Sequence, residues 1–262
     1  MGASGAGKTT LLNIIACRID HYQKDAPVGS AQGSLFANDL EYSFRDFGNF
    51  ANYVMQNDVL LQSLTVRETL EYVAALRLKL GTQDRKEIVK KLVHDLKLEK
   101  CVDVVVGGDL LKGISGGEKK RTAIAFELIS DPSVIMLDEP TSGLDSLTAF
   151  IICNYLRDLT RKENKTVLMT IHQPNSDIFK LFDKLILMVE GRMVYQGAAE
   201  QAVTYFDRMG FICPDFSNPP DYFMSILHHE STVNVGNYPK YFETYDKQLS
   251  LQVQNEITQK KL

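Results

Sequence analysis

The 262-residue sequence contains no run of 18 consecutive apolar residues, and its N-terminus lacks the basic, apolar and small-residue succession of a signal peptide. These absences argue against a bilayer-spanning helix and against a cleaved secretory leader within these residues. The four cysteines are widely spaced, with no Cys-x-x-Cys pair, at Cys17, Cys101, Cys153 and Cys213. That spacing is typical of reduced thiols in a cytosolic protein and not of a zinc site or a disulfide framework.

The chain also lacks an excess of positive charge. Lys plus Arg number 29 and Asp plus Glu number 33, which gives a formal net charge of −4. A mainly electrostatic nucleic-acid binder is therefore not expected. The length and the 44% hydrophobic content predict one large globular domain, or one with an insertion, and we find no internal repeat.

Hydrophobic periodicity predicts alternating strands and helices. Strands are expected at residues 52–55, 134–137 and 166–171, and at residues 184–189 and 192–195 around the hairpin signal Glu190-Gly191. Helices are expected at residues 8–19, from residue 65, and at 85–98, 117–130 and 146–161, with a Thr65–Glu68 capping box and a cap at Ser146. The alternation implies an α/β fold with a mostly parallel sheet and a helical insertion at about residues 60–130.

Three segments carry weaker patterns. Residues 20–34 are polar and contain glycine, so a loop is expected there. Residues 213–222 hold Pro214, Pro219 and Pro220, and we expect an ordered turn. Residues 231–262 are more polar and are expected to be a linker, which leaves residues 1–230 as the globular domain.

The first residues carry a phosphate-binding motif. The pattern G-x-x-x-x-G-K-[ST] is matched by Gly2, Ala3, Ser4, Gly5, Ala6, Gly7, Lys8 and Thr9, and a helical pattern follows. Small residues let backbone N–H groups close around phosphate oxygens, and the helix start adds its positive dipole end. We expect Lys8 to reach the β- and γ-phosphates and Thr9 to offer a hydroxyl to Mg²⁺. The alternative is a glycine-rich turn that merely precedes a helix.

Two acids, Asp138 and Glu139, follow directly after the apolar run 134–137. An acid at the end of a buried strand can hold Mg²⁺ through water, and the next acid can polarise an attacking water. Adjacent carboxylates also cap helices or lie in solvated loops. Because a phosphate-binding motif lies in the same chain, nucleotide hydrolysis is the better interpretation.

A second candidate anion site lies between these two motifs. The run Ser115-Gly116-Gly117-Glu118 stands at a predicted helix start, where backbone N–H groups can face an anion. Most proteins with a phosphate-binding loop have no such element. In this position it resembles the signature motif S-G-G-[QE] of the ATP-binding cassette (ABC) family, and the resemblance runs through nearly the whole chain.

The remaining motifs of that family fall in order. Gln56 matches the Q-loop, Asp138 and Glu139 match the Walker B acid and the catalytic glutamate, Asp145 matches the D-loop, and His172 matches the switch histidine. The resemblance implies a RecA-like P-loop NTPase fold with an inserted helical subdomain. It also implies ATP and Mg²⁺ as ligands.

The resemblance further implies a role for each matched residue. Residues 2–10, including Thr10, would hold the phosphates, and Thr9, Gln56 and Asp138 would serve Mg²⁺. Glu139 would be the general base, His172 would hold the γ-phosphate, and Gln56 would touch the attacking water. A second cassette would pair head to tail, so that Ser115, Gly116, Gly117 and Glu118 contact its ATP while Asp145 links the two sites.

Further runs resemble the White-type (G) subfamily, in which the cassette precedes its membrane domain in one polypeptide. They are Glu118 followed by Lys119-Lys120-Arg121, then Ile171-His172-Gln173-Pro174, and residues 138–145 and 218–223. We therefore expect an ATPase that powers transport, held on the cytoplasmic side of a membrane by a transmembrane domain outside these residues, with no nucleic-acid partner. The basic run 119–121 itself is expected to be a solvated helix face.

The sequence departs from the family pattern at its start, because family cassettes place strands before the phosphate-binding loop. We expect a truncated cassette that lacks the first strands of the fold and folds weakly alone. Two alternatives stay open. One is a non-catalytic nucleotide-binding regulator made by truncation, and the other is a soluble ABC ATPase that acts on ribosomes or DNA.

Overall fold

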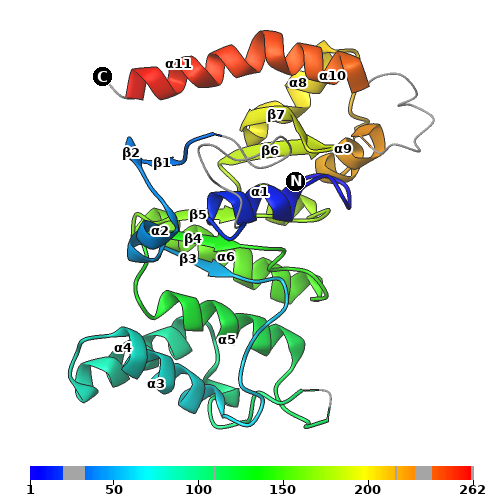
Figure 1. The fold of residues 1–262 in the computed structure, drawn as a ribbon. Helices are drawn as coiled ribbons and strands as arrows, with labels where there is room; N and C mark the ends of the chain where they lie inside the picture. The colour runs from blue at the N-terminus through cyan, green and yellow to red at the C-terminus, as the bar shows by residue number, and fades with distance from the viewer. Residues whose placement is uncertain (20–32, 109, 216, 228–237, 261–262) are drawn as a thin grey trace. The chain divides into compact units, whose positions relative to one another are not determined.

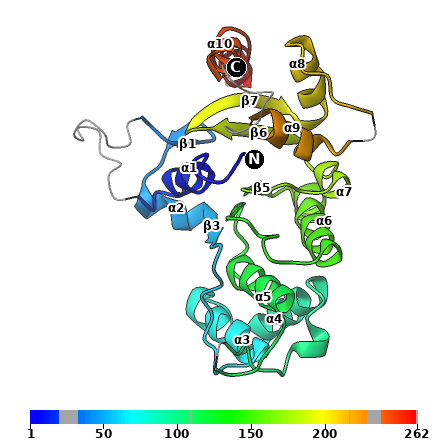
Figure 2. The same cartoon turned by 90° about the vertical axis from the view of Figure 1, so that its right-hand side faces the viewer.

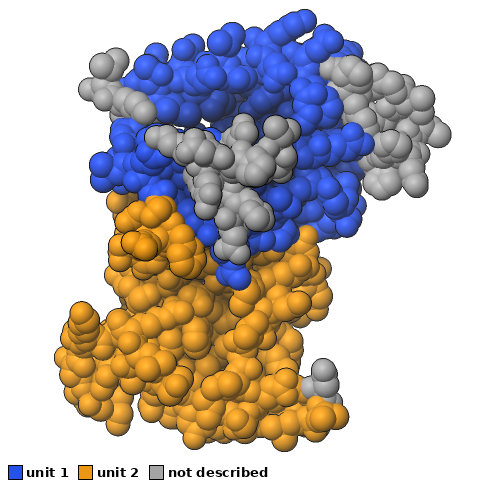
Figure 3. Space-filling view, in the orientation of Figure 1, with its two compact units in different colours: residues 1–42, 170–262 blue, residues 43–169 orange. Residues whose placement is uncertain are grey.

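The structure is a computed structural model that describes residues 1–19, 33–108, 110–215, 217–227 and 238–260 (Figure 1). The loop expected at residues 20–34 therefore lies almost wholly outside the described residues. The chain divides into two compact units. Unit 1 comprises residues 1–42 and 170–262, and unit 2 comprises residues 43–169 (Figure 3).

Unit 2 contains a three-stranded parallel sheet, as the sequence predicts. Its strands lie in the order β3 (Ala51–Val54), β4 (Val134–Leu137) and β5 (Thr166–Met169), so β4 is in the middle. The last three residues of β4 are buried because a central parallel strand is covered on both faces. β5 ends two residues before the end expected from the sequence.

Helices cover this sheet and extend from it (Figures 1 and 2). They are α2 (Phe44–Phe50), α3 (Val66–Arg77), α4 (Thr82–Asp95), the 3₁₀ turn η1 (Glu99–Cys101), α5 (Gly116–Leu128) and α6 (Ser146–Lys162). Helix α5 packs against β3, and α3 and α4 pack against α5. The helical insertion expected at residues 60–130 is thus present. Its core joins Leu70 and Ile124 to Leu137 of the sheet.

The helix caps in unit 2 confirm one expectation and correct another. Thr65 accepts a hydrogen bond from the backbone N–H of Glu68, whose carboxylate accepts from the N–H of Thr65, so the expected capping box is formed. Ser146 was expected to cap α6, but Asp145 is the cap and Ser146 is the first helical residue. The Asp145 carboxylate reaches the N–H of Thr148, which a side chain at position 146 is too far along the helix to do.

Unit 1 contains a β-hairpin and several short helices. They are α1 (Lys8–Ile15), β1 (Phe36–Ala37), β2 (Leu40–Glu41), α7 (Ser176–Phe179), β6 (Lys184–Val189), β7 (Arg192–Ala198), η2 (Ala199–Gln201) and α8 (Ala202–Arg208). The expected hairpin is confirmed, since β6 and β7 are antiparallel and both turn residues, Glu190 and Gly191, have positive φ. Helix α1 ends four residues before the expected end, and Cys17 beyond it is in the left-handed region.

The C-terminal part of unit 1 is more helical than the sequence predicts. Its elements are α9 (Pro219–Leu227), α10 (Tyr238–Thr244), the π-helical η3 (Tyr245–Leu249) and α11 (Ser250–Lys260). Helix α9 begins inside the expected proline turn, because the first turn of a helix needs no N–H from proline. Tyr241 of α10 is fully buried and donates a hydrogen bond to the carbonyl of Ile226, although it lies in the expected linker. The domain boundary near residue 230 stays a prediction.

Candidate functional site

The phosphate-binding motif forms a tight loop at the start of α1 in unit 1. Gly7 is the N-cap of α1 and has φ 89°, a left-handed conformation that favours glycine. Lys8 is only 7% exposed, and its ammonium donates hydrogen bonds to the carbonyls of Gly2 and Ala3, each at 3.0 Å. The lysine charge is therefore held inside the loop, while Thr9 and Thr10 lie exposed on the first turn of α1.

The β6–β7 hairpin supports this loop. Gly2 forms a parallel bridge with Met188 of β6, and a Cβ at Gly2 would collide with the Met188 carbonyl oxygen. At the hairpin turn, the N–H of Gly191 donates to the carbonyl of Ala6 at 3.1 Å. Gly7 also faces Gly191, since a Cβ on Gly7 would lie 3.4 Å from the Gly191 Cα. Glycine at these positions lets the two backbones approach closely.

Two neighbouring strand ends bring three predicted residues together in unit 2. Asp138 follows β4, is 3% exposed, and donates its backbone N–H to the Val54 carbonyl at 3.0 Å. Glu139 comes next in the left-handed region, with φ 45°. Gln56 follows β3, and its Nε2 donates a hydrogen bond to Glu139 Oε2 at 2.9 Å. A side-chain amide thus orients the carboxylate that we predict to be the base.

The predicted signature motif begins α5 with a second capping box. Ser115 accepts a hydrogen bond from the N–H of Glu118, and the Glu118 carboxylate accepts from the N–H and the hydroxyl of Ser115, both at 2.8 Å. The backbone N–H of Ser115, more than any other group, lowers the pKa of Glu118 below its ordinary value. Glu118 is therefore an anion occupied with capping its own helix.

The two signature glycines have different surroundings. An added Cβ at Gly116 would meet no atom of the described residues within 4 Å. At Gly117 it would lie 2.7 Å from Cγ2 of Thr148, a residue of α6. The hydroxyl of that threonine donates to Asp145 at 2.7 Å and lowers its pKa. Packing inside one chain therefore connects the signature helix to the D-loop aspartate.

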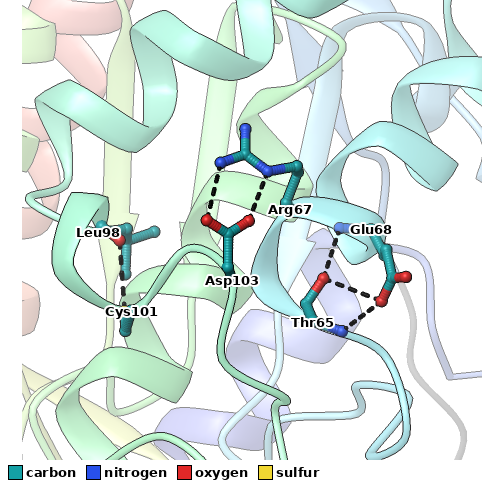
Figure 4. A network of polar contacts seen from close by, with 6 residues as sticks. All are labelled: Thr65, Arg67, Glu68, Leu98, Cys101 and Asp103. Carbon is teal, nitrogen blue, oxygen red and sulfur yellow. Dashed lines mark hydrogen bonds and ion pairs between the residues drawn. The ribbon is translucent and has the colours of Figure 1, made fainter.

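A polar network holds the segment that leads to Ser115 (Figure 4). Arg67 at the start of α3 pairs with Asp103 through Nε and Nη2, at 2.7 and 3.2 Å. The backbone N–H of Arg67 donates to the Val102 carbonyl at 2.8 Å, which satisfies a donor of the first turn of α3. One residue before Ser115, the N–H of Ile114 donates to the Val105 carbonyl at 3.2 Å. The start of α5 is thereby anchored to the start of α3.

The structure thus places the predicted residues in two groups. Unit 2 brings Gln56 to Glu139 beside Asp138, and it brings the signature glycines close to the cap of α6. Unit 1 holds residues 2–10 and also His172, which is exposed directly after the buried Ile171. The roles of all these residues stay predictions.

The sequence analysis missed one buried contact, that of Lys120, and the structure corrects the expectation for this residue. Lys120 was expected on a solvated helix face, but its side chain is only 5% exposed and lies 2.7 Å from Asp58 Oδ1. A usable signal was present in the sequence. Lys120 falls on the i, i+4, i+8 stripe of α5 with Ile124 and Leu128, both of which are buried.

Comparisons with known proteins agree with this arrangement. The family profile described as "ABC transporter" matches residues 1–142, and one described as "ABC-2 type transporter" matches residues 172–246. The chain is 41% identical over 239 residues to the broad substrate specificity ATP-binding cassette transporter ABCG2 of Bos taurus. It is 44% identical over 232 residues to ABC transporter G family member 13 of Arabidopsis thaliana. These alignments cover 90% and 88% of this chain but 35% and 33% of the relatives, so the chain spans about a third of their length.

Solved structures share the fold. The dimeric post-hydrolysis structure of the ATP-binding cassette MJ0796 bound to ADP and Pi aligns with a TM-score of 0.62 and 23% identity, over 76% of this chain and 83% of that one. CbiO1 from Clostridium perfringens, part of the transporter complex cbiONQ, aligns with a TM-score of 0.64 and 22% identity, over 80% and 79%. The expected α/β P-loop NTPase fold is confirmed.

The share of the chain that the family profile matches is large enough to assign the family. Residues 1–142 are more than half of the chain, and the relatives named above are G-type proteins. Within the described residues, no helix combines the length and apolar character needed to cross a bilayer. The chain belongs to the ABC transporter family and is an ATP-binding cassette of its White-type (G) subfamily.

Proposed function

We propose that this cassette binds and hydrolyses ATP to power transport across a membrane. The observation that carries the proposal is the hydrogen bond from Gln56 to Glu139 at the edge of the parallel sheet. This bond orients the carboxylate that we propose to accept a proton from water. Asp138, one residue earlier and buried, is the acid suited to hold Mg²⁺.

The residues present suit a triphosphate with its metal ion. The Nζ of Lys8 lies within the loop, and an added Cβ at Gly5 or Gly116 would meet no described atom within 4 Å, so ligand oxygens can approach the backbone there. Mg²⁺ would neutralise phosphate charge, with the Thr9 hydroxyl, Gln56 and Asp138 as its protein partners. Glu139 would take the proton of the attacking water, and His172 would hold the γ-phosphate. Gly117 and Thr10 would add backbone N–H groups to the phosphate sites.

The partners follow from the same family. We propose head-to-tail pairing with a second cassette, in which Ser115, Gly116 and Glu118 face its nucleotide and Asp145 links the two sites. The relative MJ0796 was solved as a dimer with ADP and Pi, which supports this pairing. The match of residues 172–246 to "ABC-2 type transporter" favours a membrane exporter over a soluble ABC ATPase. The cassette would then lie on the cytoplasmic side of its membrane, joined to a transmembrane domain.

The direct test is ATP hydrolysis by the 262-residue chain and its Glu139→Gln variant. Because the variant keeps the shape of the side chain but removes the base, we expect kcat to fall about 100-fold or more while nucleotide still binds. Glu87→Gln on α4, an exposed glutamate far along the sequence from every motif, is the matched control. Hydrolysis that survives in the Glu139→Gln variant would refute the assignment of the base.

Solution mass tests the pairing. The Glu139→Gln variant is measured with and without ATP, because blocked hydrolysis should retain the closed pair. A mass that doubles only with ATP would support the head-to-tail sandwich. A monomer under both conditions would contradict pairing by this chain alone.

A further inference from the structure

The ammonium of Lys120 is buried in unit 2 among three oxygens. Its Nζ lies 2.7 Å from Asp58 Oδ1 and donates to the carbonyls of Gln56 at 2.8 Å and Met55 at 3.4 Å. Lys120 belongs to α5, whose N-cap is the signature serine Ser115, whereas the oxygens belong to the segment after β3. This segment, residues 55–58, is called the Q-loop segment below.

The contacts give the lysine two hydrogen-bond acceptors and one opposite charge. The carbonyls of Gln56 and Met55 accept from the ammonium, while Asp58 Oδ1 is an ion-pair neighbour at 2.7 Å that accepts no hydrogen bond. The carboxylate of Asp58, itself 16% exposed, supplies the opposite charge that a buried cation requires. The lysine occupies a helix position whose neighbours one and two turns on, Ile124 and Leu128, are buried apolar side chains. A cation at such a position is costly unless it is paired, so packing alone does not account for a lysine there.

We propose that Lys120 is a positioning residue for Gln56 and ties the signature helix α5 to the predicted catalytic glutamate. Its ammonium holds the backbone carbonyl of Gln56, and the side chain of Gln56 holds Glu139 at 2.9 Å. A displacement of α5 would therefore reach the base through these two hydrogen bonds. The inference rests on the proposed ATPase function, and it assigns Lys120 no contact with nucleotide.

A plain alternative is that Lys120 serves only to neutralise Asp58. The two roles are separated by the double variant Lys120→Met/Asp58→Asn, which removes both charges and so leaves no unpaired carboxylate in the interior. The single variant Lys120→Met breaks the carbonyl bonds and also leaves Asp58 uncompensated. If neutralisation were the whole role, the double variant would recover the activity that the single variant loses.

The first experiment compares kcat, KM for MgATP and the thermal midpoint across these variants. For Lys120→Met we expect kcat to fall about tenfold or more, with a smaller change in KM for MgATP because Gln56 is also a proposed partner of Mg²⁺. The double variant should regain much of the thermal midpoint but keep the lowered kcat. Recovery of kcat together with the midpoint would overturn the proposal. Lys90→Met on α4, an exposed lysine, controls for loss of surface charge.

Hydrogen exchange tests the same idea without any need for ATP hydrolysis. We expect Lys120→Met to accelerate amide exchange in the Q-loop segment while residues 134–137 of β4 stay protected. Unchanged exchange at residues 55–58 would overturn the positioning role of Lys120, whether or not the chain hydrolyses ATP. Absence of ATP hydrolysis by the wild-type chain would count separately against the proposed function.

If the methionine variants do not fold, the Asp58→Asn variant still tests the positioning role of Lys120. It keeps Lys120 and its bonds to the two carbonyls but removes the opposite charge, so the thermal midpoint should fall while kcat and exchange of the folded chain stay within about twofold of wild type. A lower kcat together with faster amide exchange at residues 55–58 would overturn the positioning role of Lys120.

Discussion

The side-chain amide of Gln56 donates a hydrogen bond to Glu139, with 2.9 Å between Nε2 and Oε2. The two residues are 83 positions apart in sequence. They meet because β3 and β4 are parallel neighbours in which Val54 pairs with Leu137, and each residue stands two positions beyond its strand. The carboxyl ends of parallel strands share one edge of the sheet, and that edge carries the predicted chemistry.

This relationship predicts a pH effect for Gln56→Glu. Two carboxylates at hydrogen-bond distance resist joint ionisation, so the pKa of the pair should rise. A base works only when deprotonated. We therefore expect the acid limb of the kcat profile to move to higher pH, and kcat at pH 7 to fall about tenfold or more.

The measurement is kcat against pH for wild type and variant. The chain offers a matched control in Gln83→Glu, because Gln83 also donates to a glutamate, Glu87, at 3.2 Å, and both are exposed residues of α4. The control should leave the profile unchanged. A Gln56→Glu profile identical to that of wild type would show that Gln56 does not act on the base.

A comparison of the two capping boxes of unit 2 distinguishes an effect on stability from an effect on ATP hydrolysis. Thr65→Ala and Ser115→Ala each remove an N-cap hydroxyl, and each should lower the free energy of unfolding by about 1 kcal/mol in urea titrations. Only Ser115→Ala should also reduce ATP hydrolysis beyond what its stability explains. Equal activity losses in both variants would mean that Ser115 serves as a cap alone.

The lowered pKa of Glu118 predicts a pH dependence of stability. A carboxylate whose pKa is lower in the folded state than its usual 4.5 stabilises the fold above pH 4.5, and this contribution disappears as pH falls through the lowered folded-state value. Glu118→Gln should therefore destabilise the chain more at pH 7 than at pH 3. Urea unfolding at both pH values measures the difference. A destabilisation that is the same at pH 7 and pH 3 would contradict an ionic role for this cap.

The signature glycines predict opposite outcomes for two small substitutions. Gly117→Ala places a Cβ 2.7 Å from the methyl group of Thr148, so we expect a loss of about 1–3 kcal/mol in unfolding free energy. Gly116→Ala meets no described atom within 4 Å and should keep or slightly raise stability, as alanine does in helices. If Gly116 is small for the sake of nucleotide, its alanine variant should still lose ATP-dependent pairing. Thermal unfolding and solution mass with ATP distinguish the cases.

The motif residues could be identified from the sequence because phosphate chemistry demands particular residue types at fixed spacing. The loop at residues 2–9, the acid pair after a buried apolar run, and the S-G-G-E helix start are local patterns. The strand at residues 134–137 and the Thr65–Glu68 capping box were predicted for the same reason, since each depends on neighbours within a few positions.

Features that depend on distant residues could not be predicted in this way. Tyr241 looked like part of a polar linker, yet it is buried because α10 packs on β7 and its hydroxyl finds the Ile226 carbonyl. Lys120 looked like a surface lysine, yet α5 packs against β3 and brings it to the Q-loop segment.

The sequence by itself therefore determined the family and the α/β fold, and it predicted the reacting groups, because these depend on residue type and local spacing. Only the tertiary structure decided how the groups are held. It joined Gln56 to Glu139 and buried Lys120 beside Asp58. The physical reason is that a buried charge or an oriented carboxylate needs a partner, and here the partner lies on another element, 62 to 83 residues away, that only folding brings within hydrogen-bond distance.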